Sequence, residues 1–434
     1  MDLRVPVRYN RNTRTVRSVG IEIAHLNLES VPGRIEKKSP ILEKYCFVPY
    51  DSEYIPTKDS SLEFHKYFRA CNLLMDQVES ISHETLTQNR FPLTEEINAC
   101  FEDNINELTD DQYLLKGLKL ATLNQDLLQY KMKEWFFSYI CHSGKDLLNN
   151  ALVNEDSLKL MIEIISENSF KNLSVVEVNR NFPIVSILAV KILRKYSHSN
   201  LKKSVLIAPN VLDVEQELLD KYNIQFLSEE LFPSISKKEE HDLAISSFTC
   251  GTVSELQNLI QTLSSIVKSN GFILLFYKDK ANPAELFISS VCGEELQVHS
   301  EAVLESVLQD RNLIILSKIS DPFGGSLYLI RSPSQASPQS LVQVTKNDYS
   351  WVDQVKEEIL RVKSGTIWLV AQDSPINGIV GMVNCLKRES DGERIRCVFI
   401  QEKENNVPSL NPNNPFYHHI LKKDLIMNVW RNGS

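Results

Sequence analysis

One stretch of this chain has the strand, turn and helix pattern in which a cofactor-binding turn occurs. Residues 173–188 read LSVVEVNRNFPIVSIL, the pattern of a buried strand, a turn and the start of a helix. In α/β folds a nucleotide-type cofactor binds at such a turn, where glycines let the backbone bend sharply and approach the ligand. Here Glu177 is followed by a turn without glycine, made of Asn179, Arg180, Asn181, Phe182 and Pro183. The frame of a cofactor domain is present without the residues that admit the cofactor.

Other clusters of reactive side chains are weaker candidates. Cys141 and His142 are adjacent, and neighbours on a helix point in different directions, so we expect one buried and one exposed residue instead of a thiolate pair. His418 and His419 have no carboxylate or cysteine three or four residues away, which favours a surface loop over a metal site. Residues 373–381 hold two glycines before a predicted helix, but not the closely spaced pair of a dinucleotide turn.

The composition excludes several classes of function. At 434 residues, with 42% hydrophobic and 24% charged, the chain has room for two or three domains. A net charge of -9 argues against nucleic acid or an anionic membrane as partner, because either needs a basic face. No apolar run approaches a membrane span and the N-terminus does not begin a signal peptide, so we expect a cytoplasmic protein. Eight scattered cysteines predict neither disulfides nor a metal site.

The elements that precede the turn are helical in pattern. Ser60 and Glu63 have the spacing of a capping box. Apolar residues at helical spacing follow on one face, and similar patterns recur as far as Ile165, which predicts a helical subdomain over 57–170. The apolar residues of the first helix are Phe64, Tyr67, Phe68, Cys71, Met75 and Val78.

From the turn onward, short apolar runs alternate with helical segments. This pattern predicts a mostly parallel sheet covered by helices on both faces, with strands at 174–178, 204–208, 242–246 and 272–276. Two further runs, 312–318 and 326–331, are joined by a loop that contains Asp-Pro-Phe-Gly-Gly. They predict an antiparallel hairpin that closes one edge of the sheet. By analogy of fold, such a sheet is typical of S-adenosylmethionine-dependent methyltransferases.

A second, smaller α/β unit is predicted after a segment rich in Ser, Pro and Gln. That segment, 332–340, has the composition of a domain boundary. The pattern beyond it predicts strands at 341–345, 366–371 and 395–400, and helices at about 348–363 and 377–387. Such a sheet is incomplete by the usual size of these folds, so we expect it to complete itself against a segment that this chain does not contain.

Sequence runs near both ends of the chain resemble one family. Residues 367–386 read IWLVAQDSPINGIVGMVNCL, and with 394–398 and 424–429 they closely resemble animal-type fatty acid synthase, in the region between its dehydratase and its enoyl reductase. Residues 40–50, PILEKYCFVPY, are similar to the linker that leaves the dehydratase. The matches occur in order over nearly the whole chain. The chain is also similar to animal fatty-acid-synthase-like polyketide synthases.

The resemblance implies a division into segments of a larger polypeptide. It implies an α/β fold class: a helical subdomain, a Rossmann-like methyltransferase core with a C-terminal antiparallel hairpin, and a small truncated unit like a short-chain dehydrogenase. The implied segments are the end of a dehydratase (1–30), a linker (31–56), the helical subdomain (57–170) and core (171–331) of a pseudo-methyltransferase, a linker (332–340) and a truncated structural pseudo-ketoreductase (341–434). In this family the catalytic ketoreductase half follows the enoyl reductase, so we expect this chain to be a piece of the whole.

The resemblance also allows a test of the methyltransferase site. Active C-methyltransferases of related polyketide synthases follow the first strand with Glu-h-Gly-x-Gly-x-Gly, where h is apolar. That pattern places the acid on Glu177, and its glycines on Asn179, Asn181 and Pro183. Side chains there occupy space that the methyl donor needs, and proline also removes an N–H.

Two further positions of the active enzymes are changed here. The acid that would hold the ribose hydroxyls falls near Pro209 and Asn210, with Asp213 a little further on. The Asn-x-x-His that supplies the catalytic base falls on Phe248 and Gly251. We therefore expect no catalytic residue, no metal, no bound S-adenosylmethionine and a vestigial pocket. That pocket comprises Glu177, Asn179, Asn181, Pro183, Pro209, Phe248 and Gly251.

Together these observations predict a non-catalytic structural segment of a multifunctional fatty acid synthase that uses acetyl-CoA, malonyl-CoA and NADPH. The alternatives are an S-adenosylmethionine-dependent C-methyltransferase of an animal polyketide synthase and a regulatory domain that binds a nucleotide or acyl group. The implied partners are the catalytic ketoreductase half, the dehydratase and the enoyl reductase, with acyl carrier protein bound transiently. We expect the fragment to be a monomer, the parent to be a homodimer, and NADPH to bind only elsewhere in the parent.

Overall fold

The structure is a computed structural model with two compact units, Met1–Cys46 and Phe47–Ser434. It describes residues 7–10, 15–18, 21–23, 51–53, 58–84, 111–123, 133–139, 143–169, 173–179, 183–195, 201–208, 216–228, 241–333, 338–344, 349–362, 364–372, 378–386, 389, 392–401 and 409–431. In the first unit, β1 (Val7–Asn10), β2 (Thr15–Ser18) and β3 (Ile21–Ile23) form an antiparallel sheet in that order. Strand β3 consists of Ile21, Glu22 and Ile23.

The second unit contains an eight-stranded sheet whose order is β4-β10-β11-β9-β8-β5-β6-β7. The five strands from β9 to β7 are parallel, and β11 runs antiparallel between β9 and β10. The strands are β4 (Asp51–Glu53), β5 (Leu173–Val178), β6 (Leu201–Ala208), β7 (Ile224–Ser228), β8 (His241–Phe248), β9 (Val267–Lys278), β10 (Ile314–Ser320) and β11 (Gly325–Arg331). The predicted parallel sheet with an antiparallel hairpin is confirmed.

Both edges of this sheet differ from the prediction. The hairpin does not close an edge, because β4 pairs in parallel with β10 and lies outside it. Residues 51–53 fall in the range that the sequence assigns to a linker, and a three-residue strand is too short to give a period. At the opposite edge β7 has only one fully buried residue, Ile224, so its sequence lacks the apolar run that marks the central strands.

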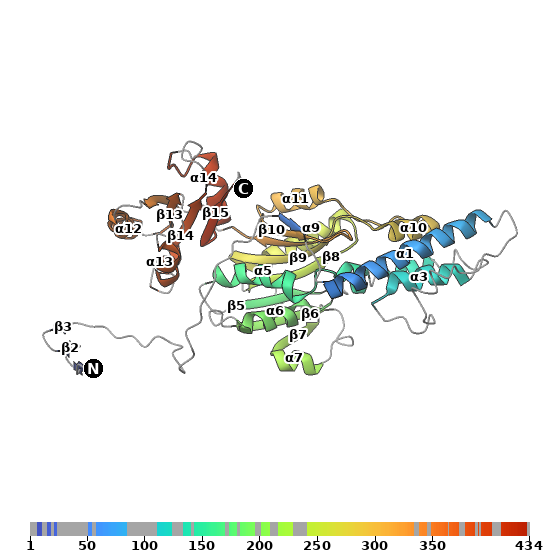
Figure 1. Cartoon of the computed structure of the whole chain (residues 1–434), viewed down its shortest axis with the longest axis horizontal. Coiled ribbons are helices and arrows are strands. Elements are labelled where there is room, and N and C mark those ends of the chain that lie inside the picture. Colours follow the sequence, from blue (N-terminus) through green and yellow to red (C-terminus); the bar gives the residue numbers. More distant parts are fainter. Residues whose placement is uncertain are drawn as a thin grey trace. The chain divides into compact units, whose positions relative to one another are not determined.

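Helices cover both faces of the sheet (Figure 1). On one face α5 (Glu155–Glu167) and α6 (Val185–Lys195) pack their apolar sides against β5, β8 and β9. On the other, α9 (Val253–Ile266) and α11 (Glu301–Asp310) pack against the alternate residues of the same strands. A smaller apolar cluster joins α6, β6, α7 (Gln216–Tyr222) and β7. The two apolar layers explain why the central strands read as continuous hydrophobic runs.

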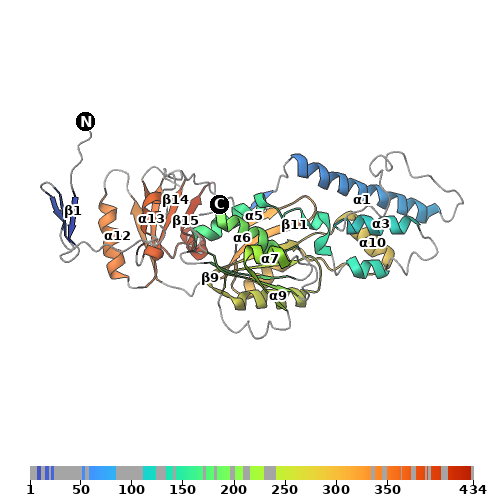
Figure 2. The same cartoon turned by 90° about the horizontal axis from the view of Figure 1, so that it is seen from below.

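A helical cluster stands beside the carboxyl ends of the strands. It contains α1 (Lys58–Glu84), α3 (Tyr113–Leu123), a helix at 133–139 and α10 (Pro283–Cys292), and α1, α3 and α10 lie together in both views (Figure 2). The predicted apolar face of α1 is confirmed at Tyr67 and Cys71, which are buried in this cluster. The capping-box prediction is wrong, because α1 begins at Lys58 and Ser60 lies inside it. Helix α5 packs on the sheet, although its range falls in the predicted helical subdomain.

Within the second compact unit, the described residues from 338 to 431 form a separate four-stranded parallel sheet in the order β12-β13-β14-β15, and this part is called the C-terminal unit below. Helices α12 and α13 pack on one face and α14 on the other. The bounds are β12 (Gln339–Val344), α12 (Ser350–Arg361), β13 (Thr366–Gln372), α13 (Ile379–Leu386), β14 (Ile395–Ile400), α14 (Pro415–Lys423) and β15 (Met427–Trp430). The three predicted strands and two predicted helices are confirmed, whereas α14 and β15 are additional. His418 and His419 lie on α14, so the predicted surface loop is wrong.

Candidate functional site

The cleft position of this sheet lies outside the carboxyl ends of β5 and β8. From β5 the chain proceeds to β6 and β7 on one side, and β8 and β9 lie on the other. The order therefore reverses between β5 and β8, and ligands of doubly wound sheets bind at such a reversal. Here the two strand ends are tied together, because the hydroxyl of Ser246 donates a 2.8 Å hydrogen bond to the carbonyl of Val178.

The carboxylate of Glu177 is turned into the fold instead of toward this cleft. Its side chain is only 2% exposed. One oxygen, Oε2, accepts from the backbone N–H of Ser186 at 2.7 Å, and Oε1 accepts from that of Val185 at 3.1 Å. These N–H groups open α6, where the helix dipole favours an anion. Burial raises the pKa of Glu177 in spite of these donors.

The turn after β5 is held by its own side chains. Asn179 is 6% exposed, and its side-chain amide donates to Oε1 of Glu177 at 3.0 Å and to the carbonyl of Pro183 at 3.5 Å. Its backbone N–H donates to the carbonyl of Ile207 at 2.8 Å. The amide of Asn179 thus spans the turn that glycines would leave open. Asn181 and Pro209, the two remaining members of the predicted pocket on this side, lie outside the described residues.

Phe248, at the end of β8, belongs to the apolar layer beneath the cleft. The residue is 9% exposed. Its ring stacks on that of Tyr277, with the ring centroids 6.1 Å apart and the ring planes at 14°. Tyr277 in turn meets Tyr328 edge-on at 6.1 Å. The Phe248 side chain has no group that could accept a proton or orient a substrate oxygen.

Gly251 has a backbone conformation that disfavours a side chain. Its φ is +144°, which L residues rarely adopt. A Cβ built there would lie 2.9 Å from Oε2 of Glu255 and 3.2 Å from the Phe248 ring. The loop is also fixed by the hydrogen bond from the Gly251 N–H to the carbonyl of Gln297, at 3.0 Å. A histidine at this position would therefore be strained in this structure.

The structure brings a different histidine to this loop. Nε2 of His299 lies 2.7 Å from the carbonyl oxygen of Gly251, so Nε2 must carry the proton and donate it, since a carbonyl can only accept. The backbone carbonyl of His299 accepts from the hydroxyl of Tyr277 at 2.8 Å. His299 is 48 residues from Gly251 along the chain, and no spacing in the sequence points to this contact. In this arrangement its imidazole fixes the loop.

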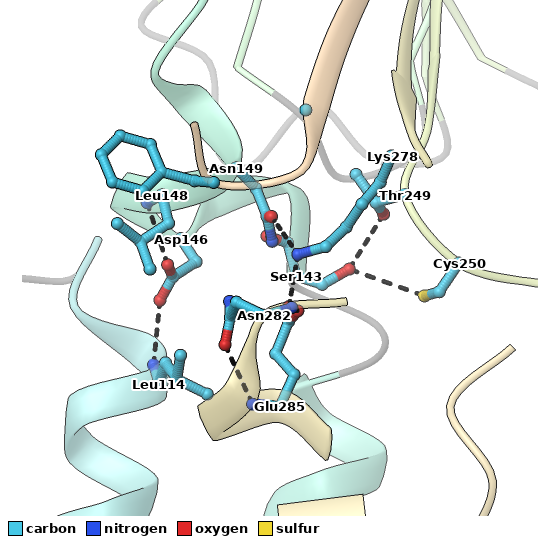
Figure 3. Close-up of polar contacts among 12 residues, drawn as sticks. Leu114, Ser143, Asp146, Leu148, Asn149, Thr249, Cys250, Lys278, Asn282 and Glu285 are labelled. Atoms are coloured by element: carbon cyan, nitrogen blue, oxygen red, sulfur yellow. Dashed lines mark hydrogen bonds and ion pairs between the residues drawn. The ribbon is translucent and has the colours of Figure 1, made fainter. Parts of the chain in front are cut away.

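A buried lysine organises the polar groups between the sheet and the helical cluster (Figure 3). Lys278, at the end of β9, is 4% exposed, and its Nζ lies 2.6 Å from Oε1 of Glu285 and 2.5 Å from Oδ1 of Asn149. The hydroxyl of Tyr139 donates to the same Glu285 oxygen. Glu285 also closes a capping box with Asn282 at the start of α10. The Nζ of Lys278 therefore donates to groups of the protein itself, Glu285 and Asn149.

A second buried carboxylate completes the network. Asp146 accepts from the hydroxyl of Tyr67 at 2.7 Å and from the backbone N–H groups of Leu114 and Leu148 at 2.9 and 3.1 Å. Burial raises the pKa of Asp146 to about 6. These partners lie on α1, α3 and the short helix η3 (Leu147–Asn150), so the carboxylate joins three segments. Neither carboxylate was predicted from the sequence, although Asn282-Pro-Ala-Glu285 has the form of a capping box with proline at the first helical position.

Two cavities lie near this network. One of about 10 Å³, the size of a single water, is lined by Lys278, Asn149 and Thr249 among others. The other, about 400 Å³, is lined by the end of the β10–β11 hairpin, with Asp279, Lys280 and Lys318.

In the described part of the chain, no group of three His, Cys, Asp or Glu could hold a metal ion. Likewise, none of the described helices is both long and apolar enough for a membrane span.

Comparison with known proteins yields one family and a set of solved structures. Residues 348–434 match the family described as fatty acid synthase, pseudo-KR domain. Similar structures include the CMeT domain of the citrinin polyketide synthase, at 11% identity over 65% of this chain and 82% of that one, with a TM-score of 0.38. The trans-methyltransferase CalH, in complex with SAH, has 11% identity over 64% and 92%, and a TM-score of 0.35. An O-methyltransferase family protein from Burkholderia thailandensis has 14% identity over 65% and 100%, and a TM-score of 0.34.

Proposed function

We propose that this chain has a structural function and not a catalytic one. It is a fatty acid synthase-type region with a pseudo-KR domain at residues 348–434. In this proposal the methyltransferase-type core is inactive. The pseudo-ketoreductase supports the catalytic ketoreductase half of the same multienzyme, in which dehydratase and enoyl reductase are further neighbours. The parent makes fatty acids from acetyl-CoA, malonyl-CoA and NADPH in the cytoplasm, and NADPH binds outside this segment.

The observation that carries the proposal is the position of Glu177. In the active enzymes this acid belongs to the methyl-donor motif, and here both of its oxygens accept from the opening N–H groups of α6 or from Asn179. A buried carboxylate with three donors is costly to redirect, because each lost hydrogen bond leaves a buried group unpaired. In this chain the acid at the motif position thus supports the start of α6 in place of a ligand.

The base position supports the same conclusion by independent geometry. Methyl transfer to carbon needs a group that removes a proton from the carbon that attacks the methyl donor. Phe248 lies in an aromatic ladder, Gly251 is in a conformation that disfavours any side chain, and the nearby His299 donates through Nε2. Phe248 and Gly251 have no basic side-chain atom, and Nε2 of His299 is engaged in its hydrogen bond to the Gly251 carbonyl.

Calorimetric titration of the whole chain with S-adenosylmethionine and S-adenosylhomocysteine tests the proposal. We expect no saturable heat at millimolar ligand. Micromolar binding together with methyl transfer to a β-ketoacyl thioester would show instead a C-methyltransferase that binds its donor through a non-standard turn. Saturable binding without transfer would favour a regulatory domain that recognises a nucleotide or acyl group.

A further inference from the structure

A turn of the C-terminal unit contacts the methyltransferase-type core through a buried carboxylate. Asp424 ends α14 with a φ of +48° and is 9% exposed. Its Oδ1 accepts from Nε of Arg396, in β14 of its own unit, at 3.1 Å. Its Oδ2 lies 3.8 Å from Nη2 of Arg331, the last residue of β11. One carboxylate thus lies between two buried arginines from different sheets.

The buried positive charge of Arg331 is compensated by this carboxylate. The side chain is 2% exposed, and its guanidinium lies 4.6 Å from the centroid of the Phe272 ring. Among the described residues, its Nε and Nη1 have no hydrogen-bond partner. Burial lowers the pKa of Arg331 to about 10, which still leaves it charged at neutral pH. A buried cation of this kind is tolerated only beside an anion, and Asp424 is the anion that the structure supplies.

Two neutral contacts continue the same junction. Asn168 ends α5, and its Oδ1 accepts a 2.7 Å hydrogen bond from the backbone N–H of Ile426, while its Nδ2 donates to the carbonyl of Ile164 at 2.8 Å. Between these polar contacts, Leu425 packs against the apolar layer formed by α5, α6 and the sheet. The three consecutive residues 424–426 therefore contact the core by charge, by apolar packing and by a backbone hydrogen bond.

We propose that Arg331 and Asn168 form a docking site on the methyltransferase-type core for residues 424–426 of the C-terminal unit. The core contributes to the C-terminal unit by fixing the turn between α14 and β15, and so the position of edge strand β15. This gives the proposed structural function a defined intramolecular partner. It differs from that function in its consequences, because docking can occur whether or not the core binds a methyl donor.

The test uses the full chain, and its probe is tryptophan fluorescence during urea unfolding. Three of the four tryptophans, Trp351, Trp368 and Trp430, lie in the C-terminal unit. Asp424→Asn keeps the size of the side chain, and asparagine tolerates positive φ, so the turn can persist without the charge. We expect Asp424→Asn and Arg331→Met each to move the tryptophan transition to lower urea. The double variant should fall by clearly less than the sum of the two, since the residues interact directly.

A matched control and a second readout separate docking from general destabilisation. Asp353→Asn removes an exposed ion pair with Lys356 in the same unit and should leave the transition unchanged. Asn168→Leu should raise the hydrogen-exchange rate of the Ile426 amide roughly tenfold while β13 amides stay protected. Additive losses in the double variant, or an Ile426 amide that exchanges as slowly as before, would overturn the docking site. S-adenosylmethionine titration of Asp424→Asn reports on the proposed function separately, because residue 424 is not in the donor pocket.

Discussion

At the scale of single residues, Glu177 illustrates how a motif acid can be used for structure. Glu177→Ala removes the acceptor of two opening N–H groups of α6, and we expect a loss of about 2–3 kcal/mol in the free energy of unfolding. Glu177→Gln keeps one acceptor and should lose less. Urea unfolding measures both, with Glu163→Ala, at a side chain that is 39% exposed, as a control that should change by no more than about 0.5 kcal/mol. If Glu177→Ala were as stable as the control, the acid would not be a helix cap.

The backbone at Gly251 yields a second prediction. Gly251→Ala places a Cβ at a φ of +144°, and we expect a loss of about 1–3 kcal/mol. Gly381→Ala is the matched control, because Gly381 lies within helix α13 and a Cβ there meets nothing within 4 Å. That change should stabilise the chain by about 0.5–1 kcal/mol. Similar melting temperatures for the two variants would show that residue 251 accepts a side chain, and with it the possibility of a base.

Asp321 gives stability a pH dependence with a defined sign. Burial raises its pKa from 3.8 to about 6, while its Oδ1 accepts from the N–H groups of Phe323 and Gly325. As the pH rises from about 4 to 6, the unfolded chain releases this proton first, so stability falls across that window. Asp321→Asn keeps the Oδ1 acceptor and removes the titration, so its stability should fall less, by a difference on the order of 2 kcal/mol. Unfolding series at pH 4, 5, 6 and 7 measure this, and an unchanged slope would contradict it.

Residue types therefore predicted what the cleft lacks better than what it contains. Phe248 and Gly251 occupy the two key positions of a single Asn-x-x-His motif, so the loss of that motif can be read from the local sequence. The contact of His299 with Gly251 and that of Lys278 with Asn149 join residues 48 and 129 positions apart. Contacts over such separations are set by how strands and helices assemble, and no periodicity in the sequence encodes them.

At the scale of elements, prediction followed the strength of the hydrophobic period. The central strands β5, β8 and β9 are buried on both faces and were predicted from their apolar runs. Strand β4 has three residues and pairs on one side only, so it left no pattern. Helix α14 was missed although Asn414 caps it and Pro415 opens it, because the proline also has the composition of a loop.

The junction of β9 with the helical cluster depends on the Lys278–Glu285 pair. Lys278→Met leaves Glu285 buried without its cation, and we expect a loss of about 3–5 kcal/mol. Adding Glu285→Gln should restore part of this, since Gln is neutral and can still accept from Tyr139. The partly exposed Lys133–Glu294 pair is the control, and Lys133→Met should cost less than about 1 kcal/mol. Thermal unfolding measures all three variants, and a double variant no better than Lys278→Met would refute the charge argument.

At the scale of the whole molecule, two features of the C-terminal unit depend on neighbours, namely its sheet edges and its 424–426 turn. Its sheet ends at β12 and β15, and its 424–426 turn packs against the core. Small sheets with unpaired edges and a narrow core are marginal by themselves. The family match at 348–434 covers this unit from α12 onward, so its dependence on neighbours bears directly on the proposed function.

We therefore expect residues 340–434, expressed alone, to aggregate or to remain unfolded, whereas the full chain stays soluble. Separation removes the contacts of Arg331 with Asp424 and of Asn168 with Ile426, and leaves Leu425 without its apolar layer. Co-expression with a catalytic ketoreductase half should recover part of the soluble protein, because that half covers the sheet edge. Recovery of the remaining soluble protein should also need the core. Circular dichroism and size-exclusion chromatography measure the outcome. A well-folded, monomeric isolate would show that the unit needs neither neighbour, and would count against a scaffold role for the methyltransferase-type core.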